Sequence, residues 1–149
     1  MERVEGVPKT VTVEVVTPTR MVVREEVEEV IAPGAEGYFG VLGGHLPFMS
    51  TLKSGELAYR KNGTWRYLAI SWGYAEVLPQ TVIILAEAAE KAEEIDVARA
   101  QQARDRAVER MARWGDESID VLRAQVSLAR ALTRIEVAGP AGEGPACAM

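Results

Sequence analysis

Cysteine and histidine are nearly absent from the sequence: each occurs once among 149 residues, as Cys147 and His45. A single cysteine cannot form a disulfide within the chain, and such sequences are typical of reducing, cytoplasmic compartments. One histidine and one cysteine also cannot supply the nitrogen and sulfur ligands of a usual zinc site. The sequence therefore predicts neither a disulfide framework nor a metal centre.

Long apolar runs and an excess of positive charge are absent as well. No run of about 18 apolar residues occurs that could span a bilayer, and the first residues lack the apolar stretch of a secretory signal. The formal net charge of −5 argues against binding nucleic acid through overall charge. Hydrophobic residues make up 48% of the chain, which is enough to form a packed core. We expect a folded protein of the cytoplasmic type that binds no nucleic acid.

Glycine and proline are scarce in only one part of the chain. Nine of the 13 glycines and five of the seven prolines precede residue 80, whereas residues 80–138 contain one glycine, Gly115, and no proline. Turns between short strands need both residue types, and helix interiors tolerate neither well. The sequence therefore predicts a β domain over residues 1–87 and a helical hairpin over residues 88–138. The tail, residues 139–149, is predicted to be disordered, with Cys147 incidental.

Several short segments of the first part alternate between apolar and polar residues, as half-buried strands do. Residues 10–16 place three valines on one face. Asn62-Gly63 separates two other segments by a two-residue turn, which pairs Arg60 with Trp65 across the strands. This pairing explains the basic and aromatic residues better than nucleic-acid binding does. The number and spacing of the segments indicate an antiparallel sandwich or a flattened barrel.

Two apolar stripes at helical spacing mark the second part. Gly115 suits the end of one helix, and Asp116 or Ser118 suits the start of the next. Helices joined by so short a turn run antiparallel, and alanines allow them to approach closely. Because about fifty residues cannot bury enough surface alone, the hairpin should dock on the sheet or on another subunit, and it should be able to move. The stripes consist of Ala100, Ala103, Ala107, Met111 and Trp114 in the first helix, and of Ile119, Leu122, Val126 and Ala129, widened by Leu128, Leu132 and Ile135, in the second.

A glycine-rich segment, residues 37–47, contains His45 and is the first candidate for chemistry. A catalytic histidine needs an orienting carboxylate and a nucleophile, and no Ser–His–Asp arrangement is apparent. The glycines do not form a P-loop, because no Lys-Ser or Lys-Thr follows them. We therefore favour an irregular strand–turn–strand loop, whose glycines adopt positive φ or let another chain approach, over a catalytic site.

Arginines of the two helices form a second candidate, a phosphate-binding site. They recur one or two turns apart on each helix, and folding the hairpin about Gly115 would bring them together near two carboxylates. The surplus positive charge could be neutralised by polyphosphate oxygens through bidentate hydrogen bonds. The alternative is a solvated face on which nearby acids pair with the arginines at little gain in free energy. The candidate set is Glu90, Asp96, Arg99 and Arg106 on the first helix, and Arg130 and Arg134 on the second.

Three motifs carry a resemblance to a known family. The loop reads Gly37-x-x-Gly40-Val-Leu-Gly-Gly-His45-Leu-Pro47. A later segment reads Ala69-Ile-Ser-Trp-Gly-Tyr-Ala-Glu-Val77, and a third contains Ile95-Asp96-Val-Ala-Arg99-Ala100. In order and spacing, these segments and their flanks resemble the epsilon subunit of F-type ATP synthase, and the resemblance covers residues 10–138.

The resemblance implies a fold and a function. The fold is an all-β sandwich of about ten strands followed by an antiparallel α-helical hairpin. The function is that of a non-catalytic rotor subunit in the central stalk of a proton-translocating ATP synthase, which couples rotation of the c-ring to ATP synthesis through the gamma subunit. The hairpin would inhibit ATP hydrolysis by extending toward the beta subunits. The location would be peripheral, on the cytoplasmic face of the cell membrane or the equivalent face of an organellar membrane, with membrane contact only through the complex.

The resemblance also assigns residues. Some family members bind ATP in the hairpin through the motif Ile/Leu-Asp-x-x-Arg-Ala, so ATP is a candidate regulatory ligand, although no cofactor is required. Tyr38, Gly40 and His45 of the loop are expected to contact gamma or the c-ring, and Arg123 is expected to face the beta subunits. The ATP contacts carried over from the family are the six residues selected above by charge: Glu90, Asp96, Arg99, Arg106, Arg130 and Arg134.

Two other classes of function are compatible with the residues alone. A free-standing ATP-sensing module would need no rotor partner and would be monomeric, with a polar surface throughout. A hydrolase that uses His45 would turn over a substrate in isolation. The rotor interpretation predicts neither behaviour.

Overall fold

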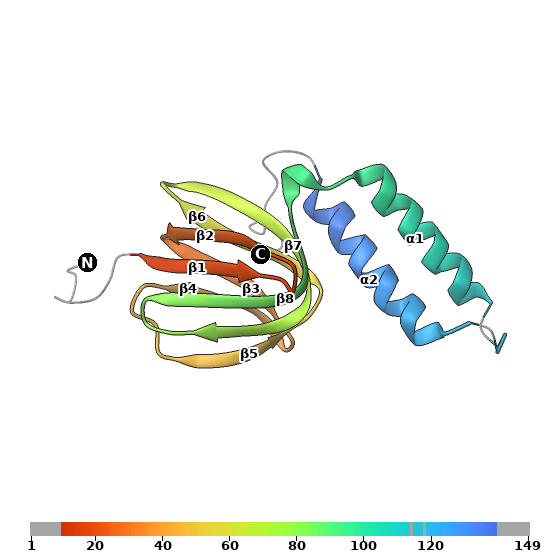
Figure 1. The fold of residues 1–149 in the computed structure, drawn as a ribbon, viewed down its shortest axis with the longest axis horizontal. Helices are drawn as coiled ribbons and strands as arrows, with labels where there is room; N and C mark the ends of the chain where they lie inside the picture. Colours follow the sequence, from red (N-terminus) through yellow and green to blue (C-terminus); the bar gives the residue numbers. More distant parts are fainter. Residues whose placement is uncertain (1–9, 114, 118, 140–149) are drawn as a thin grey trace.

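The computed structural model describes residues 10–113, 115–117 and 119–139. It consists of a β-sandwich with a hairpin of two helices at one end (Figure 1). The predicted order of a sandwich followed by a helical hairpin is therefore confirmed. The predicted tail lies outside the described residues apart from Gly139.

Eight strands form the sandwich in the described part of the chain. They pair in the order β2-β1-β8-β7-β5-β3-β4, and β6 pairs with both β3 and β7. All pairs are antiparallel except β1 and β8, which are parallel. The strands are β1 (Val11–Val16), β2 (Met21–Val27), β3 (Glu29–Gly34), β4 (Gly37–Leu42), β5 (Phe48–Leu52), β6 (Gly55–Lys61), β7 (Thr64–Val77) and β8 (Thr81–Lys91).

The strand β7 bends so that its first half pairs with β6 and its second half with β5. The bend lies at Trp72 and Gly73, whose φ angles are +50° and +153°. A Cβ on Gly73 would lie 1.8 Å from the carbonyl oxygen of Leu85, so only glycine fits against β8 here. The resemblance implied about ten strands, whereas the described part of the chain has eight, in which the residues on both sides of this bend form one continuous strand.

The core of the sandwich is aliphatic and lies between the two layers. Val11, Val13 and Val15 are at most 1% exposed, as the alternation of residues 10–16 predicts. Leu57, Leu68, Ile70 and Ile84 pack in the same cluster. Every member of this cluster belongs to the sandwich, so the sandwich has a core of its own.

The turn between β6 and β7 has the predicted register. Arg60 lies opposite Trp65, and its guanidinium carbon is 5.8 Å from the centroid of the tryptophan ring. Asn62 and Gly63 have φ angles of +51° and +77°, as a type I′ turn requires. Arg60 also forms ion pairs with Glu28 and Glu29, so its charge is balanced within the sandwich.

The helical part begins later than predicted. A short 3-10 turn (Ala92–Glu94) follows β8 and leads into α1 (Val97–Ala112) and α2 (Val121–Val137). Residues 88–91, which were assigned to the hairpin, continue β8, where Ala69 pairs with Glu90 and Leu68 with Lys91. Pairing with β7 thus overrides the helix preference of an alanine- and glutamate-rich segment.

The two helices meet along a seam of alanines. Ala100 and Ala107 of α1, and Ala124 and Ala131 of α2, are at most 2% exposed. The stripe predicted for α2 is therefore partly wrong, since Leu122 is 70% exposed. Small residues spaced by seven form the contact, and the larger side chains lie beside it or face outward. Trp114, also predicted in a stripe, lies outside the described residues.

The hairpin rests on the sandwich through α2, which lies between α1 and the strands (Figure 1). Its last turn packs against β7: Val137, Ala69 and Ile95 form a small buried cluster beside Tyr67 and Ala92. The predicted docking of the hairpin on the sheet is present, and the contact is small compared with the core of the sandwich.

Candidate functional site

Each helix begins at an aspartate whose side chain caps it. The carboxylate of Asp96 accepts a hydrogen bond from the backbone N–H of Arg99 at 3.1 Å. The carboxylate of Asp120 accepts one from the backbone N–H of Arg123 at 3.0 Å. The cap of α2 is thus Asp120 rather than Asp116, and Ser118 lies outside the described residues.

The same six-residue pattern stands at both helix starts. Residues 95–100 read Ile-Asp-Val-Ala-Arg-Ala, and residues 119–124 read Ile-Asp-Val-Leu-Arg-Ala. In both copies the aspartate is the N-cap and the last alanine, Ala100 or Ala124, is buried in the seam. This repetition is present in the sequence and was not predicted from it. Helix capping and seam packing therefore account for the aspartate and the alanine of the motif without a ligand.

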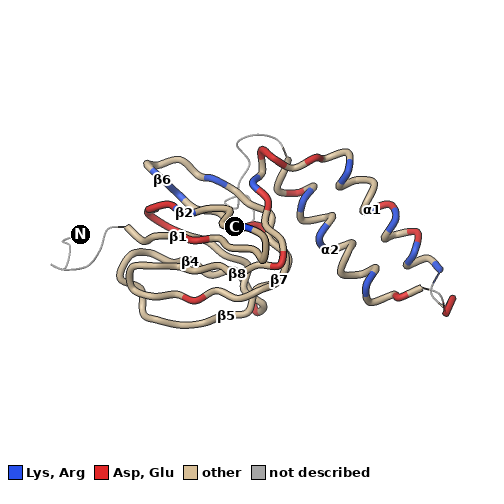
Figure 2. Tube along the Cα trace, viewed as in Figure 1, with Lys and Arg blue, Asp and Glu red and all other residues tan. Residues whose placement is uncertain are grey.

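A pocket of about 200 Å³ lies between the helices and is lined by arginines from both. Arg106 and Arg110 come from α1, and Arg130 and Arg134 come from α2. Alanines of the seam lie among them, so the guanidinium groups surround a small, apolar floor. Basic residues recur along both helices; acidic residues lie between them in α1, whereas none lies between Arg123 and Arg134 of α2 (Figure 2). Such a cluster can bind phosphate oxygens through bidentate, charge-assisted hydrogen bonds.

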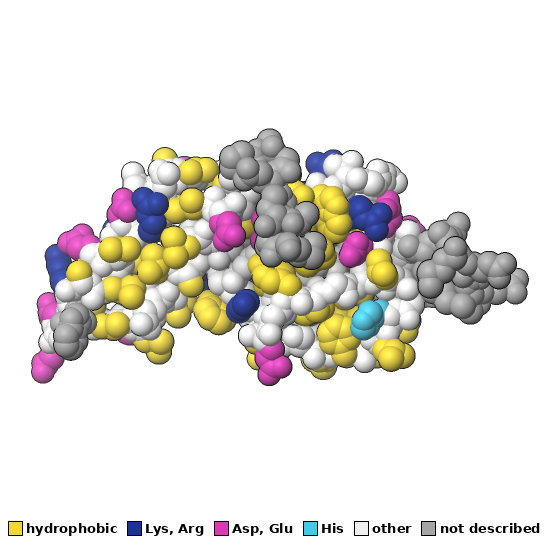
Figure 3. Space-filling model, turned by 180° about the vertical axis from the view of Figure 1, so that it is seen from behind, with side chains coloured by type: hydrophobic (Ala, Val, Ile, Leu, Met, Phe, Trp, Pro, Cys, Tyr) yellow, Lys and Arg dark blue, Asp and Glu magenta, His cyan; other side chains and the backbone are white. Residues whose placement is uncertain are grey.

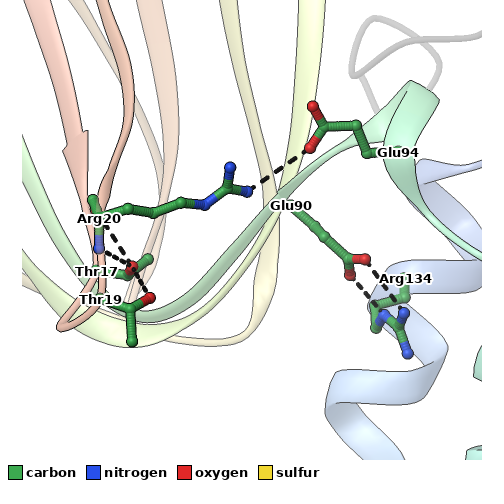
Figure 4. Close-up of polar contacts among 6 residues, drawn as sticks. All are labelled: Thr17, Thr19, Arg20, Glu90, Glu94 and Arg134. Atoms are coloured by element: carbon green, nitrogen blue, oxygen red, sulfur yellow. Dashed lines mark hydrogen bonds and ion pairs between the residues drawn. The ribbon is translucent and has the colours of Figure 1, made fainter.

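The arginines of α2 also hold the hairpin to the sandwich. Arg134 donates from Nε and Nη2 to the two carboxylate oxygens of Glu90, at 2.7 and 3.2 Å (Figure 4). Arg130 reaches Glu87 on the same strand at 3.7 Å. The Nε of Arg130 is buried and has no hydrogen-bond partner among the described residues. A second pocket, of about 220 Å³, lies between α2 and β8 and shares both arginines.

The structure brings part of the predicted phosphate site together. Arg106, Arg130 and Arg134 line one pocket, and Glu90 pairs with Arg134. Asp96 and Arg99 are not among the residues that line it. The reason is the connection between the helices: α1 ends at Ala112 and α2 begins at residue 121, so the hairpin does not fold tightly about Gly115. Arg110, which was not predicted, is placed at the pocket instead.

The glycine-rich loop contains no catalytic arrangement in the described part of the chain. His45 is half-buried, its Nδ1 lies 2.8 Å from the carbonyl oxygen of Leu46, and its ring tilts against Phe48. Gly44 has a φ of +82° and donates from its N–H to Pro79 at 2.8 Å, which ties the loop to the β7–β8 turn. Gly40 is exposed, and a Cβ there would meet no atom closer than 3.7 Å. The fold therefore does not require glycine at residue 40.

Exposed apolar side chains cross one face of the sheet. Met21, Val16, Leu85 and Tyr74 stand opposite one another on β2, β1, β8 and β7, and we call them the apolar row. Met21, Leu85 and Tyr74 are 47%, 49% and 57% exposed. Other large apolar residues are exposed at the loop end of the sandwich: Leu42, Leu46, Met49 and Leu78. In Figure 3, hydrophobic side chains lie around the histidine at this end.

A carboxylate at the foot of the hairpin has an altered pKa. Burial, and after it the negative charge of Glu136 on α2, raise the pKa of Glu56 from 4.5 to about 7. The backbone N–H of Glu56 donates to the hydroxyl of Tyr38 at 3.2 Å, and burial is also the main cause that raises the pKa of this tyrosine. Tyr38, predicted as a partner contact of the loop, therefore also lies beside the hairpin.

Among the residues that the structure describes, those that could bind a metal do not cluster. Within the described ranges, no group of three or more His, Cys, Asp or Glu side chains could hold a metal ion. Neither described helix is long and apolar enough to cross a membrane.

Two family models match consecutive parts of the chain. The model of the ATP synthase delta/epsilon chain β-sandwich domain matches residues 10–92. The model of the long alpha-helix domain of the same chain matches residues 93–139. The boundary between them falls between β8 and α1, where the structure changes from strand to helix.

Curated relatives match over most of their length. The ATP synthase epsilon chain of Syntrophobacter fumaroxidans is 54% identical over 128 residues, which cover 86% of this chain and 95% of that one. The epsilon chain of Geotalea daltonii is 48% identical over 130 residues, covering 87% and 94%. A chain in the structure of the Euglena gracilis mitochondrial ATP synthase has the same fold, with a TM-score of 0.76, 24% identity, and coverage of 89% of this chain and 83% of that chain.

A sandwich followed by a two-helix hairpin, with both parts matched, defines the class of the ATP synthase delta/epsilon chains. Within that class, the chain belongs to the family of the epsilon subunit of F-type ATP synthase. It is a non-catalytic rotor subunit of the central stalk, part of a membrane-associated complex.

Proposed function

We propose that the sandwich binds the gamma subunit and the c-ring through the apolar row and the loop end, and that the hairpin regulates ATP hydrolysis. The observation that carries this proposal is the apolar row. Exposed apolar side chains on β2, β8 and β7, together with the half-buried Val16 on β1 between them, form a patch that soluble surfaces usually avoid and that subunit interfaces use. The docked hairpin also contacts β8, at Glu87 and Glu90, but it leaves the apolar row uncovered, because Met21, Leu85 and Tyr74 stay about half exposed beside it.

The glycine-rich loop is the second part of the proposed interface. Gly40 has room for a side chain in the isolated chain, so its lack of one suits the close approach of another backbone. Leu46 is 79% exposed beside His45, and a partner would bury it. Tyr38, Gly40 and His45 are therefore kept as proposed contacts. Through this interface the subunit would couple c-ring rotation to ATP synthesis in a proton-translocating complex, on the cytoplasmic face of the cell membrane or the equivalent organellar face.

The hairpin is proposed to inhibit hydrolysis when it leaves the sandwich. It is docked here through the small cluster around Val137, the ion pairs that Arg134 and Arg130 form with β8, and a hydrogen bond from Thr133 to Ser54 at 3.5 Å. Contacts this limited allow a second, extended arrangement of comparable free energy. Extension would free Arg130 and Arg134, and with Arg123 they could pair with acidic surfaces of the beta subunits and block rotation.

ATP is proposed to stabilise the docked hairpin by binding the arginines between the helices. Arg106 and Arg130 line the pocket from opposite helices, so the site would be lost if the two helices separate when the hairpin extends. A ligand that binds only one of two states shifts the equilibrium toward that state. The buried and unpartnered Nε of Arg130 supports an anionic ligand at this place. Arg99 and Asp96, predicted as ATP contacts, remain part of this proposal only as neighbours of the pocket.

The test of the interface uses charge placed on the apolar row. Tyr74→Asp and Leu85→Asp in the full chain should abolish its recovery with a gamma–c-ring complex that has been depleted of this subunit. Val108→Asp is the matched control, because Val108 is 51% exposed on α1 and lies outside the proposed interface. Recovery of L85D equal to that of the wild type would contradict the proposed interface.

A further inference from the structure

The last turn of α2 lies over three aligned positions of the sandwich. Glu56 on β6 is opposite Ala69 on β7, and Ala69 is opposite Glu90 on β8. Val137 packs on Ala69 in the middle, and Arg134 binds Glu90 on one side. On the other side, the charge of Glu136 acts on Glu56. One of the two carboxylates thus forms an ion pair with the hairpin, and the other lies within the influence of the negative charge of Glu136, the residue before Val137.

No positive charge next to Glu56 offsets the repulsion between its carboxylate and that of Glu136 in the described part of the chain. On β4, the hydroxyl of Tyr38 accepts a hydrogen bond from the backbone N–H of Glu56. No hydrogen bond from this hydroxyl to the Glu56 carboxylate is present. On the β5–β6 turn, Lys53 Nζ lies 6.0 Å from the centroid of the Tyr38 ring. On β8, Glu90 is already paired with Arg134. Among the described residues, no Lys or Arg forms an ion pair with Glu56 or Glu136.

We propose that Glu56 and Glu136 make docking of the hairpin dependent on protons, so that acidification favours the docked hairpin and alkaline conditions favour its release. A proton on Glu56 removes the repulsion from Glu136 and the cost of burying a charge under α2. The proposal rests on the proposed movement of the hairpin and adds the condition that controls it.

The direction and size of the pH effect on docking follow from the difference in the pKa of Glu56 between the docked and released forms. In the docked form, burial and Glu136 raise the pKa of Glu56 to about 7, whereas an exposed glutamate keeps the ordinary pKa of 4.5. The docked form therefore binds the proton more tightly, and its advantage is lost as the pH rises through 7. From pH 8 to pH 6, the ratio of docked to released hairpin should rise at most about ten-fold, and about three-fold if solvent screens half of the effect.

The test measures docking in the full-length chain by fluorescence energy transfer. In a Cys147→Ser background, dyes are attached at Thr64→Cys on the sandwich and Gln125→Cys on α2, both at exposed positions. Between pH 8 and pH 6, the docked fraction should increase, and the increase should begin as the pH falls through about 7. Glu56→Gln should keep the docked fraction at its acidic value at every pH, and Glu136→Gln should raise docking at pH 8 and lower the midpoint.

Glu76→Gln is the matched control, because it removes one exposed carboxylate of β7 away from the hairpin and should leave the pH response unchanged. If the wild type stays fully docked at every pH, the same titration in an Arg134→Ala background brings the equilibrium into range. A pH response equal in wild type and E56Q, or no response in the R134A background, overturns the proposal.

These experiments distinguish failure of the pH-dependent docking from failure of the proposed inhibitory role of the hairpin. Docking that depends on pH and on Glu56, in a chain whose hairpin proves not to inhibit hydrolysis, would support this inference and contradict the inhibitory role. Inhibition that is equal at pH 6 and pH 8 in the assembled complex, together with pH-independent docking, would contradict this inference alone.

Discussion

Arg134 and Glu90 join the hairpin to the sandwich by two parallel hydrogen bonds, 2.7 and 3.2 Å long, between a helix and a strand 44 residues apart. The arginine side chain is only 19% exposed, so the pair is better shielded than the other ion pairs of α2. The same guanidinium lines the pocket between the helices. The group that holds the hairpin down is therefore also a group that a bound phosphate would contact.

Arg134→Ala should weaken docking by about 1–2 kcal/mol, because a bidentate charged pair is lost and Glu90 is left partly buried. This corresponds to a roughly ten-fold fall in the ratio of docked to released hairpin. The energy-transfer measurement described above checks it in the full chain. Arg123→Ala is the control, since Arg123 is exposed near the start of α2 and should not alter docking. An unchanged ratio in R134A would show that the apolar cluster around Val137 is sufficient.

The aspartates that cap the helices should contribute to stability and not to ligand binding. Asp96→Ala and Asp120→Ala should each destabilise the hairpin by about 1 kcal/mol, whereas the asparagine variants should retain most of the cap. Thermal unfolding followed by circular dichroism measures this difference. If D96N lowers ATP affinity while leaving helix stability intact, Asp96 is a ligand contact as well as a cap.

Two glycines are expected to differ in role: Gly73 is needed for folding, and Gly40 for binding a partner subunit. Gly73→Ala should destabilise the sandwich by more than about 2 kcal/mol, because a Cβ would lie 1.8 Å from a carbonyl oxygen of β8. Gly40→Ala should leave the melting temperature unchanged, yet weaken binding to the gamma–c-ring complex if another backbone approaches there. Equal binding by G40A and wild type would remove residue 40 from the interface.

ATP binding should depend on the arginines that line the pocket. Calorimetry on the full chain should show that Arg106→Ala and Arg130→Ala each weaken binding about ten-fold or more, because each removes a charged hydrogen bond to phosphate. Arg99→Ala, outside the lining residues, should change affinity by less than about three-fold. A larger loss in R99A than in R106A would place the ligand nearer the start of α1. Absence of binding at millimolar ATP would leave the arginines as a surface for other acidic partners.

Much of the fold could be predicted from local patterns. The valines of residues 10–16 and the Asn62-Gly63 turn specify a face and a register by themselves, and both are confirmed. The start of the hairpin could not be predicted in this way. Residues 88–91 have the composition of a helix, but their hydrogen bonds are made with β7, a partner that no short window contains.

The candidate site was predictable in residue type and not in geometry. Charge and spacing selected Arg106, Arg130 and Arg134, which line one pocket. The length of the connection after Ala112 decides which residues of α1 lie beside which residues of α2. This length could not be read from the sequence. The raised pKa of Glu56 depends on burial and, after it, on the charge of Glu136, 80 residues away, so it could only be found in the folded chain.

The central claim is that the sandwich attaches this subunit to the rotor while the hairpin controls hydrolysis. The most direct measurement compares the full chain with residues 1–95, which retain all of β8, after each is added to ATP synthase depleted of this subunit. The account predicts that both assemble with the complex and that the truncated chain gives the higher rate of ATP hydrolysis. Loss of assembly on truncation, or equal hydrolysis with both forms at every ATP concentration, would contradict it.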